Sequence, residues 1–360
     1  MSTISVFLPI FLLQRGYSLN EVMLYFFLHV FLGTVFFYMS MKLSQKKGIK
    51  HSIAASIPIL ALFFICLHQI VPLMNAIGRI NTLVLVDVLI SLSMAMYYSG
   101  FHIDFAKFSE KKKSTKQISI IQALALIFSI LGPLFGAVMI SFYSFEILFI
   151  IIIGALIASG IPLMFSGEFH EPLKFKMKNI FSKKVLQTDW VFIAEGMRDY
   201  AARIFWPLLL YFLMMNLNEI GGIYTISNAL LAIFTLYMGK KMTSKNRNHL
   251  MNIGAIIHSF SLAIRTLLKT LSMIAVTQGV GAISFTMINL PFHSTFYNNS
   301  KKRGIGFAIF SREVYLHIGR LLFLIIVSLL LLFMQVTLAL MIAIMIGSFF
   351  TLLMTKITDD

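Results

Sequence analysis

The chain matches itself about 198 residues downstream, which indicates that one folding unit was duplicated head to tail. Four short segments recur in the second half in the same order, with an offset that changes only as loops of different length would allow. The pairs are Phe7–Ile10 with Phe205–Leu208, Leu19–Val22 with Leu217–Ile220, Tyr38–Lys42 with Tyr237–Lys241, and Phe101–Phe105 with Phe292–Phe296. We therefore predict two parallel halves related by an internal repeat.

The composition is that of a membrane protein. Hydrophobic residues make up 58% of the chain and charged residues 12%, whereas soluble domains contain about 25% charged residues. The net charge of +16 does not indicate a nucleic-acid partner, because the basic residues lie between apolar runs instead of covering a soluble domain. A single cysteine, Cys66, excludes an internal disulfide framework. We expect the lipid bilayer as the environment of this chain.

Apolar runs of about 20 residues predict membrane-spanning helices. Twelve candidate runs are 1–14, 20–41, 51–70, 80–103, 117–141, 145–165, 189–214, 219–239, 250–268, 272–296, 305–333 and 336–355. The expected fold class is an all-α membrane protein with twelve transmembrane helices in two parallel six-helix repeats.

Lys and Arg gather in alternate loops, at 42–50, 107–116, 174–184, 240–247 and 301–303. The opposite loops hold only Arg15, Arg79 and Lys269. Because basic loops stay on the cytoplasmic side, both termini are predicted to be cytoplasmic, in the cytoplasmic (inner) membrane. The longest loop joins the halves, which gives an N-terminal half at 1–165, a linker at 166–187 and a C-terminal half at 188–360.

The first helix is expected to be incomplete. Fourteen residues span about 21 Å, less than the hydrocarbon core of about 30 Å. The repeat register aligns Met1 with Asp199, so about the first ten residues of the helix at 189–214 have no counterpart. A truncated sequence or misassigned start would place an in-frame apolar extension upstream in the coding DNA, and a stop codon there would exclude it. A thinned or tilted edge is the alternative.

Four charged residues share one side of the helix at 189–214. Glu195, Arg198, Asp199 and Arg203 follow helical spacing and sum to zero charge. A charge at the centre of a spanning helix costs about 2.5–3.5 kcal/mol, so these side chains are expected to face the bundle interior or a water-filled cavity. Arg203 is predicted near the membrane midplane. The alternative role is a structural salt-bridge network.

The helix at 305–333 carries a second set, in which Glu313, His317 and Arg320 share a face. Arg320 is predicted at mid-depth, like Arg203. For His317 and Arg312 we also weigh a supporting or snorkelling role, in which the side chain reaches the membrane surface.

A segment of the helix at 117–141 carries a family resemblance. Ser129–Gly136 reads S-I-L-G-P-L-F-G, in which Gly132 and Gly136 form a small-residue face and Pro133 bends the helix. It is similar to the glycine-proline signature of antiporter-type members of the major facilitator superfamily. The twelve predicted spans, the long central loop and the basic loops resemble that superfamily over nearly the whole chain. Helix packing is the alternative reading of the segment.

The resemblance implies secondary active transport of a small solute by alternating access. The proton in a proton-coupled version would be carried by Asp87, Glu195 or Asp199, beside Arg203. The signature favours efflux, and the alternative is uptake of an organic anion or nutrient. Arg203 and Arg320 would suit an anionic substrate. A membrane-embedded enzyme or a non-transporting receptor remains the rival class. We expect a monomer without cofactor or metal site.

Asp87 is the only acid well inside the first half, on a helix that the resemblance places along the cavity. The alternative is a structural pair with Arg79 or Arg265. His102 and His293 are related by the repeat, at the predicted cytoplasmic ends of their helices. A shared role in closing an inner gate, or core packing alone, would explain this placement.

Overall fold

The computed structural model describes residues 2–109, 114–142, 145–165, 167–168, 170, 177–213, 215–243 and 245–357. Within these ranges the regular secondary structure is helical, without a strand. The first part comprises α1 (Ser2–Gln14), α2 (Leu19–Lys47), α3 (Ile49–His68), α4 (Ile70–Ile77), α5 (Arg79–Phe108), α6 (Ser114–Phe142), α7 (Phe145–Ser159) and α8 (Ile161–Met164). The second part comprises η1 (Met177–Phe181), α9 (Lys183–Asp189), α10 (Val191–Tyr200), η2 (Ala201–Phe205), α11 (Trp206–Phe212), α12 (Leu217–Lys241), α13 (Arg247–Ile264), η3 (Arg265–Leu267), α14 (Leu271–Arg303), α15 (Ile305–Phe333), α16 (Val336–Leu353) and η4 (Met354–Lys356).

Each of the twelve predicted runs overlaps a helix, and eight described helices are long and apolar enough to cross a membrane. These eight are Leu19–Lys47, Ile49–His68, Arg79–Phe108, Glu219–Lys241, Arg247–Leu267, Leu271–Arg303, Ile305–Phe333 and Val336–Lys356. Thr115–Phe128 and Ile150–Leu163 are shorter apolar helical stretches. The chain is thus a multi-pass membrane protein, while the count of twelve spans stays a prediction.

The run at 189–214 is divided into three pieces, α10, η2 and α11. η2 is a π-helical turn, in which the backbone N–H of Trp206 donates to the carbonyl of Ala201. Pro207 follows at the start of α11 and has no N–H to continue the α-helical ladder. The proline therefore accounts for the wider helical turn at Ala201–Phe205. The Arg203 side chain consequently points in a different direction from the one it would have on a straight α-helix.

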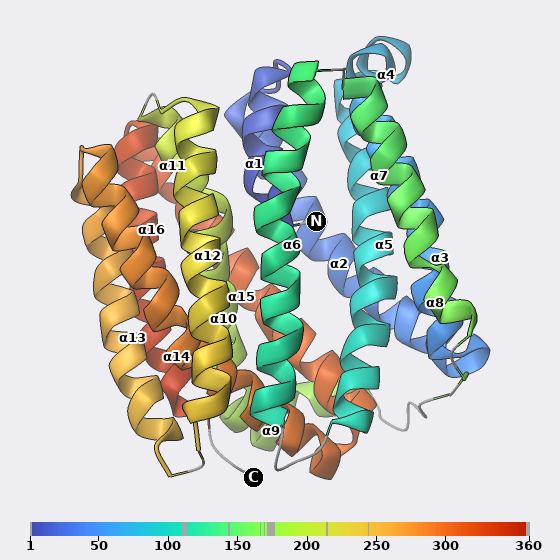
Figure 1. Cartoon of the computed structure of the whole chain (residues 1–360), viewed down its shortest axis with the longest axis vertical. Helices are drawn as coiled ribbons and strands as arrows, with labels where there is room; N and C mark the ends of the chain where they lie inside the picture. The colour runs from blue at the N-terminus through green and yellow to red at the C-terminus, as the bar shows by residue number, and fades with distance from the viewer. Residues whose placement is uncertain are drawn as a thin grey trace.

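Two groups of helices lie side by side in the fold, with α3, α5 and α7 on one side and α12, α13, α14 and α16 on the other (Figure 1). α6 contacts α7 of the first group and packs along α12 of the second. α2 contacts α5 of the first group and packs across α15, which contacts α14 and α16 of the second, so α6 and α2 join the two groups. The start of α1 lies about midway along the height of the molecule, and the C-terminus lies at one end (Figure 1).

One pair of repeated segments forms the same helix cap in both places. Ser18 caps α2 and Asn216 caps α12, and each forms a capping box with the glutamate three residues later, Glu21 or Glu219. Such caps stabilise a helix by about 1 kcal/mol. Because the two glutamates are one of the repeated pairs in the sequence, the same start signal operates in both halves. The division at 166–187 stays a prediction.

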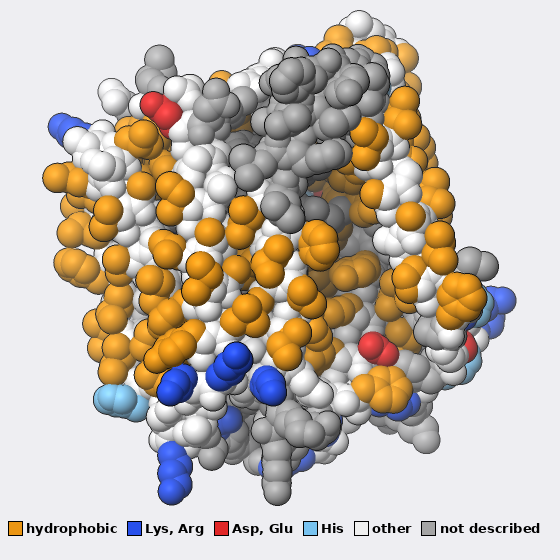
Figure 2. Space-filling view, in the orientation of Figure 1, with side chains coloured by type: hydrophobic (Ala, Val, Ile, Leu, Met, Phe, Trp, Pro, Cys, Tyr) orange, Lys and Arg blue, Asp and Glu red, His pale blue; other side chains and the backbone are white. Residues whose placement is uncertain are grey.

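The outer surface has a wide apolar region and a basic end. Figure 2 shows orange apolar side chains over most of the face and blue Lys and Arg side chains gathered toward its lower end. Phe31, Ile233 and Phe260 are each more than 60% exposed. A continuous apolar surface of this size is expected against lipid and not against water.

Two glycines allow α10 and α15 to approach closely. A Cβ atom on Gly196 would overlap the carbonyl oxygen of Leu316, and one on Gly319 would overlap the carbonyl oxygen of Ile193. The backbones of the two helices therefore touch at this point, as small residues permit in membrane proteins. This contact brings the charged faces of the two helices together.

We predict that Gly319→Ala lowers the stability of the purified chain by about 1–3 kcal/mol, because the added methyl must push α10 and α15 apart. The thermal unfolding midpoint in detergent measures the effect. Gly222→Ala on α12 is the matched control, since nothing lies within 4 Å of the added Cβ. Equal midpoints for Gly319→Ala and the unchanged chain would contradict the close contact.

Candidate functional site

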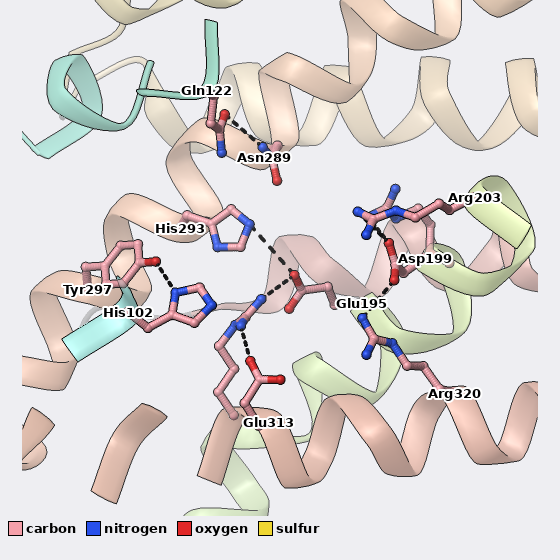
Figure 3. Close-up of polar contacts among 12 residues, drawn as sticks. His102, Gln122, Glu195, Asp199, Arg203, Asn289, His293, Tyr297, Glu313 and Arg320 are labelled. Atoms are coloured by element: carbon pink, nitrogen blue, oxygen red, sulfur yellow. Dashed lines mark hydrogen bonds and ion pairs between the residues drawn. The ribbon is translucent and has the colours of Figure 1, made fainter. Parts of the chain in front are cut away.

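A buried charge triad joins α10 to α15. Arg312 donates through Nη2 to Oε1 of Glu195, at 2.8 Å, and through Nη1 to Oε1 of Glu313, at 2.6 Å (Figure 3). All three residues are at most 9% exposed. Two carboxylates and one guanidinium carry a net charge of −1, so a proton on either carboxylate would make the triad neutral.

A third helix, α14, faces this triad. Nε2 of His293 lies 3.7 Å from Oε1 of Glu195 (Figure 3). The second carboxylate oxygen of Glu195 is buried and has no hydrogen-bond partner among the described residues. Glu195 therefore keeps an open acceptor position next to an imidazole, which is a geometry suited to receiving a proton.

Asp199 is the centre of a second network. Arg320 on α15 donates to its Oδ2 at 2.9 Å, and Nη2 of Arg203 lies 3.0 Å from its Oδ1 (Figure 3). Arg198 is more distant, with Nη2 4.0 Å from the same Oδ1. Three guanidiniums share this carboxylate, so the network has an excess of positive charge.

Arg203 differs from its neighbours in exposure. Its side chain is 57% exposed, whereas that of Arg320 is 18% exposed. A guanidinium exposed to hydrocarbon within a spanning helix is costly, which favours a water-filled space in front of Arg203. Arg203 is therefore the most exposed charge of this site.

The four charges predicted on one side of 189–214 do not form one network within that helix. Glu195 pairs with Arg312 of α15, and Asp199 pairs with Arg203 and Arg320. Arg312 does not snorkel, because its side chain is 7% exposed and bridges two glutamates. The physical cause is the glycine contact, which brings Arg312 and Arg320 of α15 within reach of both carboxylates, so that only Asp199 also keeps a close partner from its own run, Arg203.

Asp87 on α5 belongs to a separate polar group in the first half. Its Oδ1 lies 2.8 Å from Nδ1 of His29 on α2 and accepts a hydrogen bond from Ser91 at 3.1 Å. Its Oδ2 is buried without a partner among the described residues. Neither cation considered from the sequence pairs with it, because Arg79 binds Glu21 at 2.7 Å and Arg265 donates elsewhere.

The repeat-related histidines have different partners. Nδ1 of His102 and the hydroxyl of Tyr297 are joined by a hydrogen bond of 2.6 Å (Figure 3). Phe105 packs on the Tyr297 ring, with centroids 4.6 Å apart, while Phe296 packs on Phe192. His293 instead faces Glu195. The two histidines are therefore not equivalent, and a shared gating role stays a prediction.

Polar bonds between α6 and α14 continue the contact between the two groups of helices. Gln122 accepts from Asn289 at 3.1 Å, and Thr115 donates to Ser294 at 3.0 Å (Figure 3 shows the first). Together with His102 and Tyr297, they close the bundle toward the end where basic side chains gather.

Several residues that the sequence did not single out as site members are central to these contacts. His29 contacts Asp87 in the buried polar group of the first half. Asp189, at the end of α9, accepts from Arg303 at 2.6 and 2.9 Å and from Ser311 at 2.5 Å. Their partners lie on other helices, so spacing along one helix carries no signal for them.

The glycine-proline segment lies within α6, whose backbone is helical through this region. The surroundings of Gly132, Pro133 and Gly136 lie outside what the structure describes. Among the residues that the structure does describe, no group of three or more His, Cys, Asp or Glu side chains gathers as a metal site requires.

The model of the Major Facilitator Superfamily matches residues 1–320 of the chain. The chain belongs to the Major Facilitator Superfamily. The family resemblance deduced from the sequence is thereby confirmed, and membership of a transporter family favours a transporter over an enzyme. No curated protein sequence matches the chain.

Solved structures share the fold. The human organic anion transporter MFSD10 (TETRAN) is similar with a TM-score of 0.66 and 9% identity, covering 99% of this chain and 95% of that one. A bacterial homologue of the iron transporter ferroportin, in an outward-facing state, gives a TM-score of 0.70 and 12% identity, with 99% and 94% covered. The homologue soaked with iron gives 0.66 and 14%, with 99% and 95% covered. Identities this low establish the fold alone.

We predict that Arg312→Gln destabilises the superfamily member strongly, by about 3–5 kcal/mol, because two buried carboxylates lose their shared cation. Adding Glu195→Gln and Glu313→Gln to the same chain should recover most of the loss. Thermal unfolding in detergent compares the single and triple variants. A triple variant less stable than the single one would contradict this account of the triad.

Proposed function

We propose that this protein is a proton-coupled secondary transporter that exports a small solute by alternating access, as a monomer in the cytoplasmic membrane with both termini inside. The observation that supports this most is the triad of Glu195, Arg312 and Glu313. It is buried, has an excess of one negative charge and spans the contact between α10 and α15. A proton can therefore change the charge that holds these two helices together.

Glu195 is the residue to which we assign the proton. Its free oxygen and its nearness to His293 give it an acceptor position and a neighbouring group for proton transfer. Asp199 is a weaker candidate than we expected from sequence, because three guanidiniums surround it and favour its charged, deprotonated form. Asp87 is a second candidate, since it has an unpartnered oxygen and contacts His29.

Alternating access requires that the two halves separate at one end while they close at the other. The contacts of His102 with Tyr297 and of Gln122 with Asn289 hold the bundle together at its basic end. If the basic end is cytoplasmic, these bonds belong to a state closed toward the cytoplasm. The export direction rests on the glycine-proline segment, which resembles that of antiporter-type members.

Uptake or exchange of an organic anion is the second candidate. The exposed guanidinium of Arg203 supports it, because it presents a cation to the space that a solute would enter. One of the proteins that share this fold, human MFSD10, is an organic anion transporter. Iron, the substrate of ferroportin, is not part of the proposal, since the described residues show no cluster of metal ligands.

We predict that Glu195→Gln in proteoliposomes abolishes solute movement driven by a pH gradient but preserves solute exchange at equal pH. The amide mimics the protonated carboxyl group and fixes the triad in its neutral state. A panel of lipophilic cations and organic anions serves as substrate. Asp104→Asn is the matched control, because Asp104 is an exposed acid on α5.

Two outcomes would count against the proposal. Unchanged pH-driven transport in Glu195→Gln would remove the proton assignment, and no transport of any panel member by the unchanged chain would remove the transport function itself. For the second candidate, Arg203→Gln should weaken transport of anions more than that of cations. Equal effects on both classes would exclude Arg203 as an anion-binding residue.

A further inference from the structure

Arg265 is a buried cation whose side-chain partner is neutral. It lies where α13 passes into η3 and is 3% exposed. Its guanidinium donates to the amide oxygen of Gln278 and to the backbone carbonyl of Ser261. No ion pair with a carboxylate involves Arg265 among the described residues. A buried arginine without a counter-charge is costly, so this site calls for a negative charge.

The groups next to Arg265 are hydrogen-bond donors. Its Cζ lies 5.2 Å from the centre of the Trp206 ring. The indole Nε1 of Trp206, which can only donate, is buried without a partner among the described residues, and so is the hydroxyl of Tyr224. Tyr224 lies within electrostatic range of both Arg265 and Arg203. Two unused donors thus lie near an uncompensated cation.

The wider interior of this half is also positive. The enclosed polar groups of α10, η3 and α15 hold four arginines and three carboxylates, namely Arg198, Arg265, Arg312 and Arg320 against Glu195, Asp199 and Glu313. Arg198 is 7% exposed, and its Nε has no hydrogen-bond partner among the described residues. An anion bound nearby would lower the energy of Arg265, which has no carboxylate partner among the described residues, and of Arg198, whose nearest carboxylate oxygen is 4.0 Å away.

The surroundings of Arg265 are closely packed. A Cβ on Gly281 of α14 would lie 2.7 Å from Nη2 of Arg265, so the glycine leaves the room that the guanidinium needs. Trp206 is fully buried and Arg265 nearly so. An occupant enclosed among these groups must be compact, which favours a single inorganic ion over an organic solute.

We propose that an inorganic anion of the size of chloride binds between Arg265, Trp206 and Tyr224. The guanidinium supplies the charge, and the indole N–H and phenol O–H donate hydrogen bonds to the ion. Arg203 pairs with Asp199 and is not a member of this site, which goes beyond the proposed transport function. The ion stabilises the packing of α11, α12 and α14 around the end of α13.

The test uses the purified full chain in detergent at constant ionic strength, with sodium chloride or bromide replaced stepwise by gluconate. The expected result is a saturable rise of the thermal unfolding midpoint with chloride and bromide and none with gluconate. Arg265→Gln should remove the rise. Tyr224→Phe, which deletes a hydroxyl with no partner among the described residues, should weaken the apparent affinity roughly tenfold. Lys269→Gln is the matched control, because it removes an exposed positive charge four residues away.

An equal midpoint in chloride and gluconate would overturn the proposal, as would a full chloride response in both Tyr224→Phe and Arg265→Gln. If Arg265→Gln does not fold, Tyr224→Phe alone decides. A response that Arg203→Gln removes and Tyr224→Phe does not would place the anion at the solute-facing site instead, and would also overturn it. Because the readout is binding, the result is independent of whether the chain transports any solute.

Discussion

The contact between α10 and α15 is the interaction on which the polar interior depends. Charged groups inside a membrane protein are tolerated only when they are paired or hydrated, because hydrocarbon provides no alternative partner. Glu195 and Asp199 of α10 are paired chiefly by Arg312 and Arg320 of α15. This pairing requires the two backbones to touch, and Gly196 and Gly319 make that possible. Two residues without side chains therefore determine where the charges of the site meet.

The interior is divided into groups with unequal charge. The triad around Arg312 is negative and buried, the group around Asp199 is positive and partly exposed at Arg203, and Arg265 has no counter-charge among the described residues. Unequal charge within an enclosed space favours the binding of protons, charged solutes or ions, since each can cancel a local excess of charge. The proposed proton, the solute and the anion correspond to these three different excesses.

Residues at matching positions of the repeat keep their local contacts but differ in their long-range contacts. The capping glutamates Glu21 and Glu219 keep the same local role, because a helix start depends on residues within one turn. His102 and His293 do not, since one binds Tyr297 and the other faces Glu195. Residues at matching positions thus keep short-range roles after duplication, while their long-range partners diverge. Among the described residues, the first half has the Asp87 and His29 group in place of the charges on α10.

Apolar runs, basic loops and the internal repeat were sufficient to predict an all-α membrane protein, because helix length and hydrophobicity are local properties set by the bilayer. The superfamily followed from a resemblance, carried by the glycine-proline segment and the pattern of spans and loops. The sequence also located Glu195, Asp199, Arg203 and Arg320, since charges are conspicuous in apolar helices. It did not pair Glu195 with Arg312 or Asp87 with His29. Those choices depend on how closely separate helices approach one another. Tertiary structure decides them, because the distance between two helices is a property of both and is not encoded in the spacing along either one.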